Sequence, residues 1–240
     1  MKVVSVNVGK VQIQPWRDGT PSAIHKLAVS GRVDVGLLGL AGDEQADTKN
    51  HGGEDKAVFV MPESNYALFN IDQPFGFLGE NLTLSGVDET EICLGDRLQI
   101  GTVLLEVSQS RSPCWKLGQH VSDPRYGSDW TSTGFLKAYS ESGRVGFYCR
   151  VLATGALEKG QPVTWLTRNT ESEAGEEAQD DSVRNGLEKN SLIKITVQEL
   201  FLAQQFHATA KEREDLKLVV QHPALSASWK KKLTNLIATF

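Results

Sequence analysis

The spacing of the hydrophobic residues changes once along this chain, and that change constrains the fold more than any other feature. Up to residue 168 the apolar residues come in short runs separated by glycine, as in residues 3–8 followed by Gly9. From residue 191 onward they recur at intervals of three and four, the period of an amphipathic helix. Short strands with glycine turns are typical of a barrel or a sandwich. We therefore expect a mainly β fold followed by a small helical unit.

The predicted strands lie within residues 1–168. The apolar run 57–61 suits a buried strand, and a short helix is expected at 63–69. Gly101 and Thr102 separate two runs of alternating character, which favours a hairpin. Together with residues 3–8, the expected strands are 26–29, 57–61, 97–100, 103–108, 145–152 and 162–166.

Three helices are predicted within residues 191–240. Thr196 and Glu199 have the spacing of a capping box, and Thr209 and Glu212 repeat it. Ser226 is placed to cap the third helix. We interpret the lysine run 230–232 as the solvated face of that helix rather than as a phosphate-binding patch.

Charge divides the chain further. Residues 169–190 carry seven acidic and two basic residues, with Val183 and Leu187 as their large apolar residues. Such a segment buries too little apolar surface to order itself. We therefore expect a domain over residues 1–168, a flexible acidic linker over residues 169–190 and a three-helix domain over residues 191–240.

Composition excludes several classes of protein. A net charge of −5 argues against nucleic acid as the main partner, because duplex binding usually needs a strongly basic face. Three cysteines are too few for a disulfide scaffold and fit a reducing cytosol. No apolar run approaches the roughly 20 residues that span a bilayer, and no signal-peptide core follows Lys2. We expect a cytoplasmic protein without membrane association.

Two segments carry polar residues that strands and turns do not obviously need. In the first, His51 precedes two glycines that allow close backbone approach to an anion, and Lys56 adds charge. An ordinary tight loop before a strand also fits this segment. In the second, Asn81 lies between Glu80 and Leu82, where its amide can bind a heterocycle edge. A simple turn explains that segment equally well.

A third segment surrounds Cys114. It follows a predicted strand, and Arg111 and Lys116 lie on either side of the cysteine. Cationic neighbours favour the thiolate, which is both a nucleophile and a soft metal ligand. Cys93 and Cys149 lie in apolar surroundings, and we interpret them as buried filler.

Other catalytic patterns are missing from the sequence. It contains no CxxC pair, HExxH, Walker loop, GxGxxG or GxSxG motif, so zinc sites, nucleotide loops and serine hydrolases are not indicated. A cysteine hydrolase that pairs Cys114 with His51 or His120 stays open. Nothing in the sequence places either imidazole beside the thiol.

Taken together, these segments resemble a known family. The strings GLAGDEQADTKNHGGEDKAV, FGFLGENLT, CLGDRLQIG and VSQSRSPCWKLGQH are similar to the MOSC domain, named for the C-terminal domain of molybdenum-cofactor sulfurases. The last 50 residues resemble the small helical domain that follows MOSC in the YiiM-like subgroup. The resemblance implies a MOSC-type, β-barrel-like domain with a C-terminal three-helix domain.

The resemblance also implies a cofactor and a site. Relatives bind a pterin-bound molybdenum centre, the molybdenum cofactor, whose metal is held by a cysteine at the position of Cys114. The residues carried over to the cofactor and substrate pocket are His51, Lys56, Asn81, Arg111 and Lys116. Lys56 stands where relatives often have arginine, so a bidentate phosphate contact is lost there.

The implied function is reduction of N-hydroxylated compounds, such as hydroxylaminopurine or amidoximes, with electrons from a flavoprotein reductase. Two alternatives remain at this point. In the first, Cys114 carries sulfur or the cofactor without turnover. In the second, the pocket and the helices form a non-enzymatic binding module. Exposed strand edges also allow a homodimer.

Overall fold

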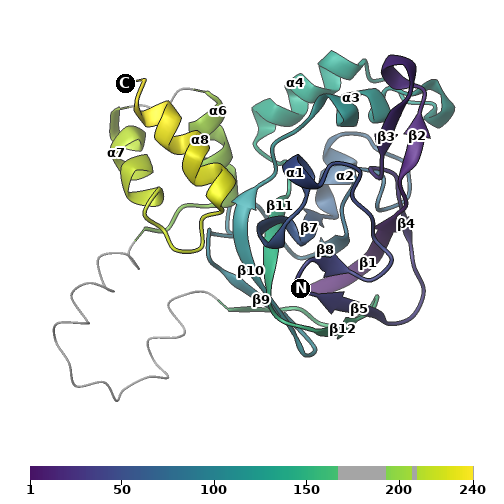
Figure 1. Cartoon of the computed structure of the whole chain (residues 1–240), viewed down its shortest axis with the longest axis horizontal. Helices are drawn as coiled ribbons and strands as arrows, with labels where there is room; N and C mark the ends of the chain where they lie inside the picture. The colour runs from purple at the N-terminus through teal and green to yellow at the C-terminus, as the bar shows by residue number, and fades with distance from the viewer. Residues whose placement is uncertain (167–192, 207–209, 240) are drawn as a thin grey trace.

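The computed structural model describes residues 1–166, 193–206 and 210–239 (Figure 1). The predicted linker at 169–190 lies outside the described residues, as does Thr209 of the second predicted capping box. The strands are β1 (Lys2–Gly9), β2 (Gln12–Gln14), β3 (Thr20–Ser22), β4 (Lys26–Ala28), β5 (Val33–Gly36), β6 (Gly39–Leu40), β7 (Val58–Pro62), β8 (Leu82–Ser85), β9 (Arg97–Ile100), β10 (Val103–Ser110), β11 (Phe147–Ala153), β12 (Gly155–Leu157) and β13 (Thr164–Leu166). All seven predicted strands are present.

The helices are distributed between the strands and the C-terminal part of the chain. They are α1 (Thr48–His51), α2 (Ser64–Leu68), α3 (Trp115–Val121), α4 (Ser132–Ser142), α6 (Val197–Gln205), α7 (Ala210–Val219) and α8 (Ala227–Ile237), with short 3₁₀ turns η1 (Trp16–Asp18), η2 (Glu54–Lys56) and η3 (Pro124–Tyr126). None of the helices in the described part of the chain has the length and apolar character needed to cross a membrane.

Eight strands form one mixed sheet in the order β13-β9-β10-β11-β7-β8-β1-β4. Its neighbouring strands are antiparallel except for β7 and β8, which run parallel. Two small sheets accompany it, β12-β5-β6 and the hairpin β2-β3. The fold is therefore mainly β, as predicted.

The main sheet curls toward itself but does not close. The backbone N–H of Val3 donates to Gln161 O (2.9 Å), and Val163 N donates to Met1 O (3.1 Å), so the segment before β13 lies against the start of β1. Pro162 lies opposite Lys2 in this contact and has no N–H to extend a ladder. The domain is thus barrel-like, as the resemblance implied, but it is a curled sheet rather than a closed barrel, and its described end strands are β13 and β4.

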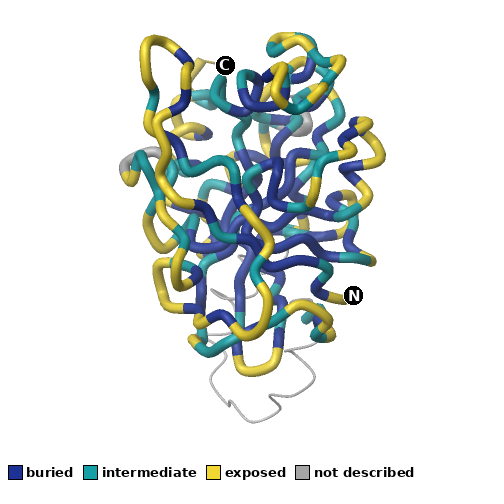
Figure 2. The backbone as a smooth tube through the Cα atoms, turned by 90° about the vertical axis from the view of Figure 1, so that its right-hand side faces the viewer, coloured by how far each residue is buried: buried dark blue, intermediate teal, exposed yellow. Residues whose placement is uncertain are grey.

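The two faces of the sheet bury separate apolar clusters. In β7, Val58 and Val60 point into the cluster enclosed by the curled sheet, whereas Phe59 and Met61 point into the cluster under the helices. This alternation follows from the two-residue period of a strand. The buried residues occupy the centre of the molecule and the loops carry most of the exposed ones (Figure 2).

The three C-terminal helices lie together on one side of the sheet, beside β10 and β11 (Figure 1). The predicted capping box is present: Glu199 N donates to Thr196 Oγ1 (3.1 Å), and Thr196 N donates to the Glu199 carboxylate (2.9 Å). Ser226 caps α8 by accepting from Trp229 N (3.2 Å). Leu200, Phe201 and Trp229 share one apolar cluster with Phe59 and Met61 of β7, so the helices and the sheet have a common core.

Helices α3 and α4 were not expected from the sequence. Gly118 and Gly134 lower the helix propensity of these segments. A Cβ at Gly118 would lie 2.5 Å from Ser132 Oγ, so the glycine allows the two helices to pack closely. Tertiary packing therefore stabilises helices that local propensity does not favour.

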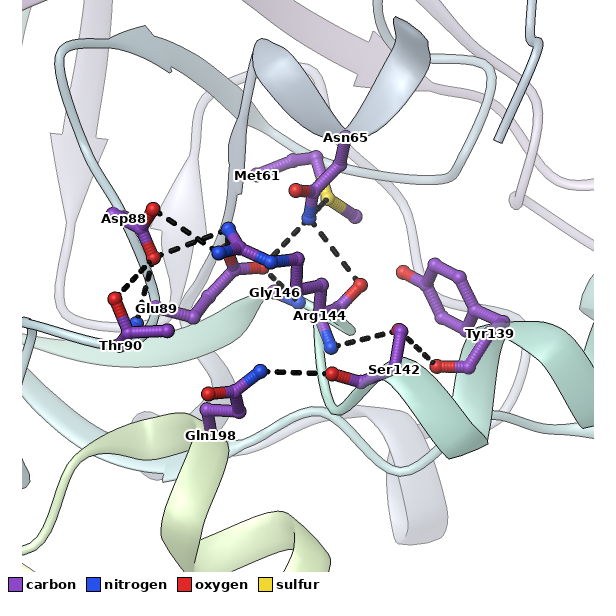
Figure 3. A network of polar contacts seen from close by, with 10 residues as sticks. All are labelled: Met61, Asn65, Asp88, Glu89, Thr90, Tyr139, Ser142, Arg144, Gly146 and Gln198. Atoms are coloured by element: carbon purple, nitrogen blue, oxygen red, sulfur yellow. Dashed lines mark hydrogen bonds and ion pairs between the residues drawn. The ribbon is translucent and has the colours of Figure 1, made fainter. Parts of the chain in front are cut away.

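A partly buried polar cluster joins the sheet, α4 and α6 (Figure 3). We call it the Glu89 cluster, and it contains Asn65, Asp88, Glu89, Arg144 and Gln198. Glu89 accepts from Asn65 Nδ2 (2.6 Å), while Arg144 lies 3.6 Å from Glu89 and 3.1 Å from Asp88. Gln198 Nε2 donates to Ser142 O at the end of α4 (2.8 Å). The cluster thus links the C-terminal helices to the rest of the molecule.

Candidate functional site

One pocket brings together all six residues that the sequence predicted for the site. Its walls come from the β3–β4 connection, the loop before α1, η2, β7, β11 and the loop after β10. The predicted residues that line it are His51, Lys56, Asn81, Arg111, Cys114 and Lys116. Their sequence positions span 66 residues, so the folding of the sheet assembles the pocket from separate segments.

Cys114 is the cysteine of the pocket. Strand β10 ends at Ser110, and Cys114 follows as the extended residue (φ −119°, ψ 159°) that precedes α3. Its side chain is half-buried in the pocket wall. Cys149 is completely buried in the core, and burial raises the pKa of the Cys93 thiol to about 11. Of the three cysteines, Cys114 is therefore the one that lines this pocket.

Arg111 brings a buried positive charge to the same wall. Its residue is 5% exposed, and its guanidinium carbon lies 5.1 Å from the Phe59 ring centre and 5.7 Å from that of Tyr139. The Nη1 atom is buried and has no hydrogen-bond partner among the described residues. A guanidinium stays protonated in proteins, so this nitrogen is a donor available for an anion in the pocket.

Three more basic residues surround the pocket. Burial lowers the pKa of His51, and the positive charge of Arg111 lowers it further, so the imidazole is neutral at neutral pH. Burial also lowers the pKa of Lys56. Lys116 Nζ donates to Pro21 O (3.0 Å), which ties α3 to the β2–β3 hairpin. The pocket is therefore rich in cationic groups although the chain as a whole is acidic.

Asn81 has a positioning role within the pocket. Its Oδ1 accepts from Phe59 N (3.1 Å), and its Nδ2 donates to Asp43 Oδ2 (2.9 Å) and Asn7 O (3.3 Å). These bonds occupy both ends of the amide with protein partners. The predicted residue thus lies in the pocket wall, where it orients Asp43.

Asp43 and Lys26 form a buried ion pair in this wall that sequence reasoning missed. Their side chains are 7% and 8% exposed, and Asp43 also accepts from Gly9 N (2.7 Å). Burial lowers the pKa of Lys26, and the charge of Asp43 opposes that shift. The sequence did contain a signal for this pair, because Lys26 stands at the start of an otherwise apolar strand. Tyr148, a further lining residue, gave no signal because an aromatic residue is ordinary in a strand.

The two histidines considered as partners of Cys114 have different surroundings. His51 lines the same pocket as Cys114. His120 is fully buried in an aromatic cluster, with its ring 4.5 Å from Phe77 and 4.9 Å from Tyr126 between ring centres. Burial lowers the pKa of His120 to about 3. Of the two, His51 is the imidazole that shares a pocket with the thiol.

Comparisons with known proteins agree with this architecture. The MOSC domain model matches residues 47–164, and the model of the YiiM-like 3-alpha helix domain matches residues 195–240. Protein YiiM of Escherichia coli is 35% identical over 174 residues, which cover 69% of this chain and 72% of that protein. A protein of Gibberella moniliformis named "Reductase" is 32% identical over 69% of this chain, but the match covers 29% of its length.

A solved structure shows the same fold. The crystal structure of YiiM from Geobacillus stearothermophilus superposes with a TM-score of 0.67 at 30% identity, covering 98% of each chain. Its agreement spans both the sheet and the C-terminal helices. The chain therefore belongs to the MOSC domain family and carries the three-helix unit of its YiiM-like members.

Proposed function

We propose that this protein is a molybdenum-cofactor-dependent reductase of N-hydroxylated compounds, with Cys114 as the thiolate ligand of the metal. Three observations support the proposal. The family is named for the C-terminal domain of molybdenum-cofactor sulfurases, and one relative bears the name reductase. The pocket also combines a cysteine with several cationic groups.

The residues of the pocket fit such a cofactor. A thiolate is the soft ligand that a molybdenum centre accepts. The buried Arg111 Nη1, which has no partner among the described residues, fits an oxyanion such as the phosphate of the pterin. This unpartnered guanidinium nitrogen in the pocket of Cys114 is the observation that carries the proposal. Lys56 and Lys116 add positive charge to the same pocket.

When bound, the cofactor would supply the two-electron chemistry of the reaction. Overall, the N–O bond of R–NHOH breaks, two electrons and two protons are consumed, and R–NH2 and water form. Cys114 would hold the metal, and Arg111 would hold the anionic group. Lys26 Nζ carries a proton at the pocket wall, and burial makes that proton easier to release.

The electrons would come from a separate flavoprotein reductase, which is oxidised as the nitrogen is reduced. No group of three or more His, Cys, Asp or Glu among the described residues is arranged to hold a metal ion. A metal at Cys114 would therefore need further ligands from the cofactor.

The test is the molybdenum and pterin content of protein purified from a host that makes the cofactor. We expect near-stoichiometric molybdenum in the wild type and in Cys93→Ser, a cysteine outside the pocket, and none in Cys114→Ser. The wild type and Cys93→Ser should then reduce an amidoxime when a reduced flavoprotein is supplied. Cys114→Ser should not.

Two results would contradict the proposal. The first is wild-type protein without molybdenum or pterin. The second is Cys114→Ser with normal metal content and full activity. Protein that binds the cofactor but never oxidises the reduced donor in the presence of an N-hydroxylated substrate would indicate a carrier instead.

A further inference from the structure

The C-terminal helices place a lysine on the loop that carries Cys114. Lys232, on α8, donates from Nζ to Ser112 Oγ (2.8 Å), two residues before the cysteine. Lys231 and Lys232 are exposed, as expected for the solvated face of a helix. The contact with Ser112 nevertheless gives Lys232 a position that a freely solvated side chain lacks.

Lys232 also lies within electrostatic reach of the pocket. Although the residue as a whole is exposed, partial burial lowers the pKa of Lys232, and repulsion from Lys56 lowers it further. Lys56 lines the pocket together with Cys114. Lys232 thus brings its charge to the loop that leads to Cys114, and Lys56 brings another to the pocket that Cys114 lines.

The docking of α8 fixes this arrangement. Asp55, the neighbour of Lys56 in η2, accepts from Ala227 N at the start of α8 (3.0 Å) and from Arg150 (2.6 Å). Arg150 also donates to Ala224 O (2.9 Å). On its apolar side, α8 buries Trp229 and Leu233 completely. The helix that carries Lys232 is thus bonded to the same turn that presents Lys56.

Lys56 is affected by the carboxylates of Asp55 and Asp47 as well as by the charge of Lys232, and an anion bound near both lysines would relieve their repulsion. The chain has a net charge of −5, yet four cations, Lys56, Arg111, Lys116 and Lys232, gather around the cysteine loop. An ammonium has three donor hydrogens, and Ser112 engages one of those of Lys232. Its exposed position leaves the group accessible to a ligand.

We propose that Lys232, together with Lys56 and Ser112, forms an oxyanion subsite next to the pocket, to which the three-helix unit contributes the lysine. The ligand it would take is a phosphate monoester group on a molecule bound in the pocket. That phosphate belongs either to the cofactor or to a phosphorylated substrate. The subsite goes beyond the reductase proposal, because it needs neither metal nor turnover.

The first experiment titrates inorganic phosphate into cofactor-free protein by isothermal titration calorimetry. The variants are Lys232→Ala, Lys232→Gln and Lys231→Ala, the last being a matched loss of charge on the same helix. Loss of one charge-assisted hydrogen bond is expected to weaken phosphate binding about tenfold in both Lys232 variants. Lys231→Ala should stay within about twofold of the wild type.

Glutamine at position 232 separates ligand binding from a structural role, because it can still donate to Ser112 but has no charge. Wild-type affinity in Lys232→Gln would overturn the proposal. So would wild-type protein that binds no phosphate, or an equal loss in Lys231→Ala. None of these results depends on molybdenum, so failure of the subsite and failure of the reductase proposal can be told apart.

A second experiment identifies the source of the phosphate. If it belongs to the cofactor, Lys232→Gln lowers the pterin content of protein from a cofactor-producing host. If it belongs to the substrate, pterin content is unchanged and KM rises for an N-hydroxylated nucleotide but not for the corresponding free base. Unchanged values in both measurements would overturn a role for the subsite in the reaction.

Discussion

The molecule contains two partly buried clusters of charged side chains, and they differ in composition. In the Glu89 cluster, Arg144 faces Asp88 and Glu89, and Glu89 also accepts from Gly146 N (3.2 Å) (Figure 3). In the pocket the cations are in excess, and Arg111 has a buried nitrogen without a described partner. In the first cluster two carboxylates face one cation, whereas in the second four cationic side chains face three carboxylates. Each cluster has a buried polar atom without a described partner, a carboxylate oxygen of Glu89 in the first and a guanidinium nitrogen of Arg111 in the second. The two clusters thus differ in the sign of their excess charge, and the positive one lines a pocket.

The strongest way to break the pocket cluster is Asp43→Ala. This substitution leaves the Lys26 ammonium buried without its carboxylate and removes the acceptor of Asn81 Nδ2. We expect the free energy of unfolding to fall by about 3–5 kcal/mol. Urea unfolding followed by circular dichroism measures it, with Glu44→Ala as the control. The exposed pair of Glu44 with Lys10 should contribute little to stability, because solvent screens it. Equal losses in the two variants would contradict the buried pair.

Arg144→Met tests the other side of the comparison. Glu89 then loses the cation that faces it, and the free energy of unfolding should fall by about 2 kcal/mol. Phosphate affinity, measured by the same titration as for Lys232, should not change because Arg144 belongs to the Glu89 cluster. Loss of phosphate binding in a folded Arg144→Met protein would show that the two clusters are not separate.

A further prediction concerns the buried carboxyl of Glu80, whose contribution to stability should depend on pH. Its Oε1 accepts from Tyr66, Gly76 and Thr83, while Oε2 is buried without a partner among the described residues, and burial raises the pKa of the carboxyl. A raised folded-state pKa gives stability that is present below the unfolded pKa and lost as pH rises through the folded value. At pH 8, Glu80→Gln should therefore have a free energy of unfolding about 1–2 kcal/mol higher than the wild type. Its unfolding temperature should rise accordingly. Near pH 4 this advantage should disappear in the same thermal scans. An equal difference at both pH values would contradict the assignment.

The smallest expected loss of stability comes from removing the N-cap of α6, the helix that carries Gln198 of the Glu89 cluster. Thr196→Ala removes one half of the capping box and should cost about 1 kcal/mol of stability. Thermal unfolding of this variant can be compared with Thr234→Ala, an exposed threonine within α8. A larger loss in Thr234→Ala would show that the cap is not what holds α6.

Local patterns in the sequence were enough to predict several features of the molecule. The capping box at Thr196 and the cap at Ser226 depend on residues three apart, so the sequence displays them directly. The six residues expected at the site could be predicted because each belongs to a recognisable string next to a strand. The fold then places all six in one pocket. Their roles in binding or catalysis remain predictions.

Other features depend on contacts between distant residues and leave no local pattern. Lys26 and Asp43 are 17 positions apart, and Ser112 and Lys232 are 120 apart. Helix α3 depends on the close approach of Gly118 to Ser132. The interpretation of residues 230–232 as a solvated face missed the contact with Ser112 for the same reason. Such pairings emerge only when the whole chain is folded.

The apolar core shared by β7 and the C-terminal helices has a consequence for how the two parts of the chain evolve. Phe59 and Met61 are covered by a cluster that includes Phe201 and Trp229, although the two parts match separate family models. A gene shortened after β13 would encode a protein that lacks part of this apolar cluster, and the apolar surface left uncovered would promote aggregation. Mutations that enlarge one side of this core select for compensating changes on the other. The two segments are therefore expected to evolve as a pair.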